Sequence, residues 1–255
     1  LLERLIVNID PVREWQIATV TSVNDESPRV KLFKLDLANE TKFRAGQYFD
    51  IRLTAPDGYQ AQRSYSVTSS PEDSNSIELA IELIADGEVS AYFHEIVKPD
   101  DQIELRGPIG GHFTLSPNFT KPVLLVAGGS GIAPIISMLR HRRSSTRIAP
   151  TVLMFSVRTE ADALFAQELE DMAQENPNLH IIIALTRSES ETPDSKQRET
   201  RRIDRSMIDS AITKLAEQPA RAYVCGGTDF VESIGNHLLD IGLAYHDIRT
   251  ERFGP

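Results

Sequence analysis

Residues 123–134 read VLLVAGGSGIAP. The first five residues are apolar without interruption, which is typical of a strand buried on both faces of a parallel sheet. After the glycines, apolar residues recur at helical spacing: Ile132, Ile135, Ile136 and Leu139. Glycines at such a junction let the chain turn tightly and let a diphosphate approach the helix N-terminus. The stretch therefore predicts a nucleotide-binding turn in an α/β domain.

The spacing of this turn departs from the usual Gly-x-Gly-x-x-Gly pattern, because Pro134 stands where the third glycine would be. Pro134 suits the first turn of a helix, where a backbone N–H is not needed. The alternative is that these glycines only allow the strand and the helix to pack closely. The position between a buried strand and an apolar-striped helix favours phosphate binding.

The rest of the second half alternates between the two kinds of element. Strands are expected at 152–157, 181–185, 222–225 and 248–251, and helices at 164–174, 206–217 and 230–241. Such alternation predicts a doubly wound parallel sheet. Residues 188–200 are polar and are expected to form a mobile loop.

The first half has a different rhythm, with short, often alternating runs separated by turn residues. Strands are expected at 15–23, 30–37, 48–53, 63–68, 77–84 and 102–106, and one helix at about 90–97. This pattern predicts an antiparallel six-stranded barrel. The rhythm changes near 116–122, so the expected organisation is an N-terminal extension (1–14), a barrel domain (15–118) and an α/β domain (119–255).

Composition excludes several classes of protein. The net charge of −10 argues against general nucleic-acid binding, which needs a basic surface. The longest apolar runs fall short of the ~20 residues that cross a bilayer, and the first residues lack a signal-peptide core, so no membrane insertion and a cytoplasmic location are expected. The single cysteine excludes an internal disulfide, and no metal site is predicted.

Arg63-Ser64-Tyr65-Ser66 begins one of the predicted barrel strands. An arginine can bind a phosphate through two N–H groups, and an aromatic ring can cover a flat heterocycle. A hydroxyl beside that ring can donate to a ring nitrogen. Together these groups suit a flavin. An edge strand with a surface arginine and a half-buried tyrosine is an equally open interpretation.

Two further turns are candidates for ligand contact. Asp86-Gly87-Glu88-Val89-Ser90 leads into the predicted helix, whose start would offer free N–H groups and a positive dipole to a phosphate. The alternative is an ordinary turn in which Ser90 caps the helix. Residues 106–113, RGPIGGHF, form a glycine-rich turn after the last barrel strand. It serves either as a sharp turn or as backbone that passes close to a ligand.

Cys225-Gly226-Gly227 ends a later parallel strand. Ligands in such sheets collect at the carboxyl ends of the strands. A lone cysteine here is most often a small buried hydrophobe. A thiol nucleophile is rejected, because no His–Asp pair is evident to activate Cys225.

These five motifs, in this order and spacing, resemble the ferredoxin–NADP reductase family over residues 15–253. The resemblance implies that Arg63 binds the flavin phosphate, that Tyr65 lies against the isoalloxazine, and that Ser66, followed by Val67, hydrogen-bonds flavin N5. It implies that Gly87, Val89 and Ser90 meet the diphosphate of FAD, which is therefore expected in preference to FMN.

The resemblance also assigns residues of the second half. It implies that Gly129, Ser130 and Gly131 meet the diphosphate of NADPH or NADH, and that Cys225 and Gly226 lie beside the nicotinamide. Residues 249–253 resemble the family's C-terminal strand near the flavin, where Ser66, Cys225 and Glu251 would be the catalytic residues. Many relatives end in an aromatic residue, but Phe253 is followed here by Gly254-Pro255.

The resemblance implies a reductase that moves a hydride from NAD(P)H to FAD and passes electrons to another protein. An attached plant-type iron–sulfur domain needs four cysteines, so with one cysteine an iron–sulfur acceptor is expected to be a separate protein. Two rivals stay open: a reductase that releases reduced flavin, and a flavin-holding, redox-responsive binding subunit.

Two arginines bear on the choice of coenzyme. Arg158 and Arg187 follow the second and third strands of the predicted parallel sheet, without an acid at either tip. An arginine there accommodates the 2′-phosphate of NADPH, whereas an acid binds the ribose of NADH. NADPH is therefore favoured, although Glu160 and Asp162 could instead pair with Arg158 as plain surface charges.

Overall fold

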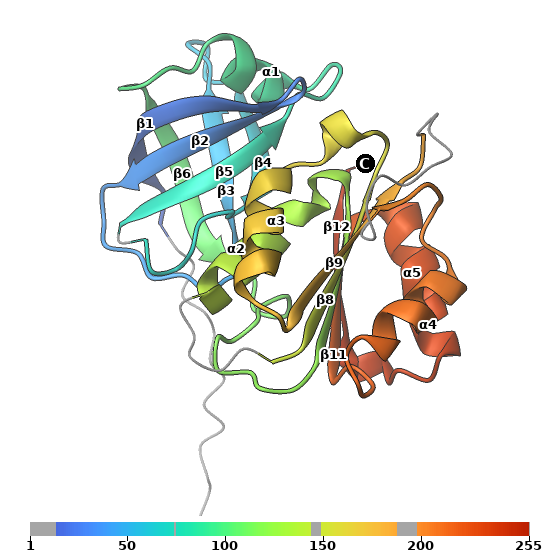
Figure 1. The fold of residues 1–255 in the computed structure, drawn as a ribbon. Helices are drawn as coiled ribbons and strands as arrows, with labels where there is room; N and C mark the ends of the chain where they lie inside the picture. Colours follow the sequence, from blue (N-terminus) through green and yellow to red (C-terminus); the bar gives the residue numbers. More distant parts are fainter. Residues whose placement is uncertain (1–13, 74, 144–148, 188–197, 255) are drawn as a thin grey trace, which may run out of the picture.

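The structure is a computed structural model that describes residues 14–73, 75–143, 149–187 and 198–254. Except for Glu14, the predicted N-terminal extension lies outside these residues. The chain forms an antiparallel sheet of six strands and a parallel sheet, as predicted (Figure 1). The parallel sheet also has six strands, one more than the sequence predicts. Within the described residues, no helix is long and apolar enough to cross a membrane.

The first sheet has the strand order β4-β3-β6-β1-β2-β5. Its strands are β1 (Gln16–Ser27), β2 (Val30–Leu37), β3 (Tyr48–Thr54), β4 (Gln60–Ser66), β5 (Ser76–Glu82) and β6 (Gln102–Ile109). An antiparallel bridge between Val67 and Leu79 joins the two outer strands and closes the sheet into a barrel. The inward residues of the strands fill its core, together with Val89 and Phe93 of α1 (Glu88–Glu95).

The second sheet is parallel and has the order β10-β9-β8-β7-β11-β12. Its strands are β7 (Val123–Gly128), β8 (Thr151–Val157), β9 (Leu179–Leu185), β10 (Arg198–Glu199), β11 (Arg221–Gly227) and β12 (Ile248–Phe253). α2 (Ile132–Arg143) and α3 (Ala166–Glu175) cover one face, and α4 (Arg205–Thr213) and α5 (Thr228–Asp240) cover the other. The central strands are therefore apolar on both sides, as their sequences indicate.

Several predicted boundaries were wrong. β6 continues to Ile109, into the first part of the glycine-rich turn, and α4 ends at Thr213, shortly before Ala216, which has a left-handed φ of 61°. The predicted loop at 188–200 contains strand β10, which pairs with Ile183 and Ala184 of β9, while 188–197 lie outside the described residues. β6 ends at Ile109 and β7 starts at Val123, so the predicted domain boundary at 118/119 falls in the connecting segment and stays a prediction.

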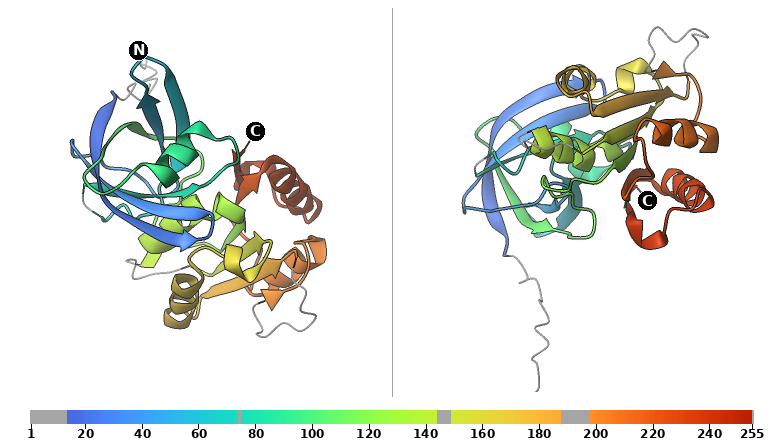
Figure 2. Two further views of the ribbon diagram at one scale, coloured as in Figure 1. Left: turned by 90° about the horizontal axis from the view of Figure 1, so that it is seen from above. Right: turned by 60° about the horizontal axis from the view of Figure 1, so that its bottom comes forward.

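Helix α2 lies where the two sheets meet (Figure 2). The sequence predicts one apolar stripe on it, but every residue from Ile132 to Leu139 is buried. The sheet covers one side of α2 and the barrel covers another: the Ser137 hydroxyl donates to the Ser69 carbonyl at 2.7 Å. Although α2 follows a strand of the parallel sheet in the chain, it therefore also contacts the barrel.

Candidate active site

A cleft of about 490 Å³ lies between the barrel and the edge strand β12. β3 and β4 provide Tyr48, Ser64 and Ser66, and β12 provides Thr250 to Phe253. The glycine-rich turn after β6 provides Gly110 to Phe113. The structure thus brings together Ser66, Glu251 and Phe253, which the sequence assigns to one site.

Ser66 and Glu251 are in direct contact across this cleft. The buried Ser66 hydroxyl donates to Glu251 Oε1 at 3.0 Å, although the two residues are 185 positions apart in the chain. Burial raises the pKa of Glu251 to about 7, and the hydrogen bond from Ser66 opposes the rise. Near neutral pH this carboxyl can therefore hold or release a proton.

Cys225 lies next to Glu251, because the two residues are register partners in the neighbouring strands β11 and β12. Its side chain is fully buried, and burial raises the pKa of the thiol well above its usual value. Cys225 is thus the buried small residue that the sequence indicates, and its thiol is neutral. Its backbone, rather than its side chain, is the part that adjoins the nucleotide turn.

The glycine turn lies directly against that backbone. Gly129 to Gly131 form one 3₁₀ turn before α2, and Pro134 falls in the first turn of α2. A Cβ on Gly131 would lie 2.3 Å from the Cys225 carbonyl oxygen, so only glycine permits this approach. Gly129 has a φ of +55° and open space beside it. Its backbone is accessible at the helix start, where phosphate binding is favourable.

Arg63 and Tyr65 lie on the opposite face of β4 from Ser64 and Ser66, and neither lines the 490 Å³ cleft. Arg63 is exposed, and its guanidinium donates only to the neighbouring Gln62 carbonyl at 2.7 Å among the described residues. The Tyr65 ring packs 6.3 Å from the Phe93 ring, and burial raises the pKa of its hydroxyl to about 12. Arg63 is available to a phosphate, while Tyr65 is partly in the barrel core.

The start of α1 differs from the interpretation in which Ser90 caps it. Gly87 is the N-cap residue, and Ser90 lies within the first turn, where its hydroxyl donates to the Gly87 carbonyl and accepts from the Ile84 N–H. Val89 and Ser90 are buried. This turn therefore offers a ligand its backbone N–H groups rather than the side chains of Val89 and Ser90.

Arg158 and Arg187 follow neighbouring strands, and the Arg187 N–H donates to the Arg158 carbonyl at 2.8 Å. Both side chains are exposed. The acids that could neutralise Arg158 are engaged elsewhere: Glu160 pairs with Arg198 at 2.5 Å, and Asp162 accepts from Thr159. The two guanidinium groups have no acidic partner among the described residues.

Basic residues lie at the cleft and beside it: His112 and Arg252 line it, and Arg44 and Arg249 lie next to its lining residues Gly111 and His112. Arg249 Nη1 lies 2.6 Å from His112 Nδ1, and the Arg44 guanidinium lies against Gly111. Burial and the charge of Arg249 lower the pKa of His112. We call Arg44, His112, Arg249 and Arg252 the basic rim. Within the described part of the chain, no acid pairs with its three arginines.

Comparison with known proteins gives the same two units. Residues 17–114 match the family model of an oxidoreductase FAD-binding domain, and residues 125–235 match that of an oxidoreductase NAD-binding domain. The chain is 28% identical to the ferredoxin–NAD(P)(+) reductase component of a naphthalene 1,2-dioxygenase system from Pseudomonas putida, over 93% of this chain and 68% of that protein. It is 29% identical to the phenol hydroxylase P5 protein of Acinetobacter pittii, over 95% of this chain and 66% of that protein.

The chain belongs to the ferredoxin–NADP reductase family. The fold agrees: a ferredoxin NADP+ reductase from Neisseria gonorrhoeae, solved with bound FAD and NADP, has a TM-score of 0.79 at 23% identity, with 93% of this chain and 98% of that one covered. The predicted family, fold and cofactors are thereby confirmed, and the protein is an oxidoreductase with FAD- and NAD(P)-binding domains.

The present chain, as a member of the ferredoxin–NADP reductase family, has a geometry that is compatible with binding both cofactors. Gly129 gives open backbone at a helix start, and Arg63 leaves an exposed guanidinium beside β4. The cleft has a hydroxyl donor, Ser66, at its base. The assignment of individual residues to FAD or NAD(P)H stays a prediction.

Sequence reasoning missed Tyr48 and Ser64, which also line the cleft. Ser64 Oγ donates to Asp50 at 2.7 Å, and Arg106 donates to the other oxygen of Asp50 at 2.7 Å. Burial, Asp50 and Glu251 raise the pKa of the Tyr48 hydroxyl. The alternation of β4 could have revealed Ser64, because it shares a face with Ser66.

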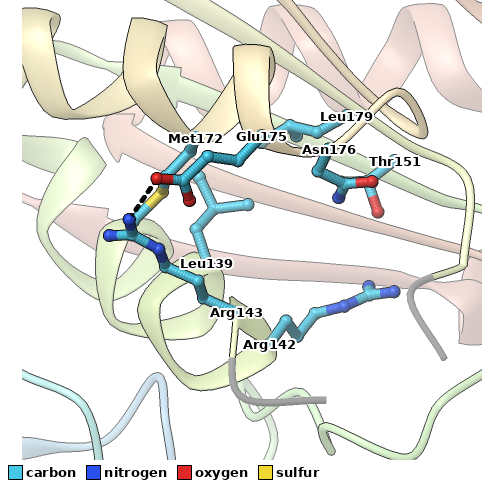
Figure 3. A pocket seen from close by; sticks show the side chains of 8 residues that line it. All are labelled: Leu139, Arg142, Arg143, Thr151, Met172, Glu175, Asn176 and Leu179. Atoms are coloured by element: carbon cyan, nitrogen blue, oxygen red, sulfur yellow. Dashed lines mark hydrogen bonds and ion pairs between the residues drawn. The ribbon is translucent and has the colours of Figure 1, made fainter. Parts of the chain in front are cut away.

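A second cavity of about 170 Å³ lies between α2 and α3 (Figure 3). Leu139, Met172 and Leu179 form its apolar wall, and Arg143 faces Glu175 beside it. None of the site residues predicted from the sequence lines this cavity. The reaction site is therefore assigned to the larger cleft.

Proposed function

We propose that the protein takes a hydride from NAD(P)H onto FAD and passes electrons to a separate acceptor protein of the ferredoxin-like or oxygenase iron–sulfur kind. The observation that carries this proposal is the contact between Ser66 and Glu251 in the cleft where the two domain types meet. When bound, FAD accepts two electrons from a nicotinamide and can release them singly. The chain therefore needs to bind, align and stabilise charge.

Each part of that task has a candidate residue. Arg63 and the N–H groups at the start of α1 would hold the phosphates of FAD, and Gly129 to Gly131 those of NAD(P)H. The Ser66 hydroxyl would donate a hydrogen bond to the flavin ring where negative charge develops. Glu251, with a pKa of about 7, would hold or release a proton beside it. The neutral, buried Cys225 would shape the nicotinamide site.

The basic rim supports a particular kind of acceptor. Three arginines that have no acidic partner among the described residues lie at the cleft or beside it, in a protein whose net charge is −10. An acidic protein surface would neutralise them and would bring its redox centre near the flavin. Several of the similar proteins are reductase components of oxygenase systems, which supports an acceptor protein rather than free reduced flavin.

A spectroscopic experiment tests this function. The purified protein should show a flavin absorption spectrum, release FAD on denaturation, and bleach when NADPH or NADH is added without oxygen. Ferricyanide should then restore the colour repeatedly. Flavin that leaves the protein during gel filtration would favour the flavin-releasing reductase, and a bound flavin that neither nicotinamide bleaches would favour the binding subunit.

A further inference from the structure

Helix α2 connects the nucleotide turn to the segment that follows Ser66. Its first residue follows Gly131, and its C-terminal half contacts the barrel through Ser137 and Arg140. Ser137 Oγ donates to the Ser69 carbonyl at 2.7 Å, and Arg140 Nη1 donates to the Thr68 carbonyl at 3.0 Å. These acceptors lie two and three residues after Ser66 in the chain. The two candidate cofactor sites are thus joined by one helix.

Arg140 joins more than two segments. Its Nη1 also donates to Glu78 of β5 at 2.7 Å, while its Nε and Nη2 bind both oxygens of Glu168 in α3 at 2.8 and 2.7 Å. Its guanidinium lies 5.2 Å from the Phe165 ring. One side chain thereby fixes β5, the end of β4 and α3 relative to α2.

The charges make Arg140 hard to replace. Glu26 of β1 accepts the N–H of Phe165 nearby, and burial, with Glu78 and Glu168, raises the pKa of Glu26. Two carboxylates therefore bind Arg140, and the charge of Arg140 lowers the pKa of a third carboxyl, Glu26, nearby. The hydrogen bonds to Glu168 and Glu78 raise the pKa of Arg140 despite its burial, so its charge is permanent. Without this guanidinium the acids would repel one another across the contact between barrel and sheet.

We infer that Arg140 is a positioning residue for hydride transfer, which holds Ser66 at a fixed distance from the nucleotide turn. This inference rests on the proposed function. A helix rises 1.5 Å per residue, so Gly131 and Arg140 are about 13 Å apart along a rigid rod. Reacting groups misplaced by about 1 Å can lose on the order of a hundredfold in rate. A change at Arg140 is therefore transmitted to the reacting groups without any contact with them.

Arg140→Lys and Arg140→Met test this inference. Lysine keeps the charge but cannot bind Glu168 with two parallel N–H groups, and methionine removes the charge. We expect the rate constant of anaerobic flavin reduction by NAD(P)H to fall about ten- to hundredfold in both variants, with the loss larger in Arg140→Met. FAD content and the dissociation constant of NADP+ should stay close to those of the wild type, because both diphosphate sites are intact.

A second measurement does not depend on turnover. Titration with NADP+ or NAD+ perturbs the spectrum of bound flavin when the nicotinamide lies on the ring. The amplitude of this difference spectrum should fall in the Arg140 variants, while its midpoint is unchanged. A purely structural role would instead lower the melting temperature and FAD content and leave the amplitude per bound flavin unaltered.

Arg143→Met is the matched control. Arg143 lies one turn further along α2, and it pairs with Glu175 of α3 at 2.5 Å (Figure 3); among the described residues it has no hydrogen bond or ion pair with the barrel. Its loss should leave both the rate and the amplitude unchanged. A normal reduction rate in folded Arg140→Lys, or an equal loss in Arg143→Met, would overturn the inference. If the wild type itself is not reduced by either nicotinamide, the proposed function fails first.

Discussion

Ser66 has a single hydroxyl hydrogen, which the structure directs to Glu251. On the proposed mechanism this hydrogen is redirected to the flavin as negative charge develops, so it stabilises the transition state more than the ground state. Ser66→Ala should therefore retain FAD but slow flavin reduction by about 10²–10³. Ser64→Ala is the control on the same face of β4, because the Ser64 hydroxyl is already bonded to Asp50. Stopped-flow reduction at an unchanged rate in Ser66→Ala would remove the role assigned to Ser66.

Glu251 makes the stability of the flavin-free protein depend on pH. Its pKa is about 7 in the folded protein against an ordinary 4.5, so the folded state holds the proton more tightly than the unfolded state. This contribution to stability is lost as the pH rises from about 4.5 to about 7, by as much as about 3 kcal/mol. Glu251→Gln keeps an acceptor for Ser66 and removes the titration. In urea unfolding, the free energy of unfolding of the variant should rise relative to that of the wild type between pH 5 and pH 8. A difference in this free energy that does not change with pH would contradict a raised pKa for Glu251.

At the scale of elements, the contact between the glycine turn and β11 leaves no room for a methyl group. Gly131→Ala would place Cβ 2.3 Å from the Cys225 carbonyl, and such overpacking costs about 1–3 kcal/mol. We expect a lower free energy of unfolding and weaker binding of NADP+. Gly235→Ala in α5 meets nothing within 4 Å and should stabilise the protein by about 0.5–1 kcal/mol. Equal free energies of unfolding and equal NADP+ affinities in the two variants would show that the close approach of Gly131 to Cys225 is not required.

The ends of β8 and β9 carry the prediction about coenzyme choice. Each charge-assisted hydrogen bond to a 2′-phosphate contributes about 1.5–3 kcal/mol. Arg158→Ala or Arg187→Ala should therefore raise the KM for NADPH on the order of ten- to hundredfold and leave the KM for NADH little changed. Steady-state kinetics with both coenzymes measures this. Equal losses for NADPH and NADH would mean that these arginines do not bind the 2′-phosphate.

The sequence was sufficient for the elements and their order, because alternation and apolar runs are local properties. The glycine turn stood out because of its position between a buried strand and a helix, and the family resemblance assigned Ser66 and Glu251 to one site, where the structure places them in contact. The sequence could not provide what depends on distant pairing: the β10 strand, the cleft position of Tyr48, or the contacts of Arg140. Arg140 lies in an ordinary basic helix end, and only the packing of β5 and α3 against it shows its role.

At the scale of the whole molecule, the distribution of charge predicts how the acceptor binds. Arg249→Glu and Arg44→Glu should raise the KM for an acidic acceptor protein, and the wild-type KM should rise with salt. Reduction of ferricyanide should serve as the measure of intact reductase activity. Arg205→Glu on α4, far from the basic rim in sequence and paired only with Asp209 among the described residues, is the control. If neither salt nor the basic-rim variants changed the KM for the acceptor protein, the acceptor would not dock at the basic rim.

The position of α2 also bears on how such proteins can exchange parts. A recombinant chain that joined this barrel to the α/β half of a relative at residue 118 would inherit α2 from one parent and the β4–β5 segment from the other. Arg140 would then face a residue at position 78 that did not evolve with it, whereas the backbone carbonyls at positions 68 and 69 are present in either parent. A hybrid would therefore need Glu78 to come from the same parent as α2, even though Glu78 lies far inside the barrel sequence. The contact between α2 and the barrel, rather than the segment that links the two sheets, therefore decides which residues must be exchanged together.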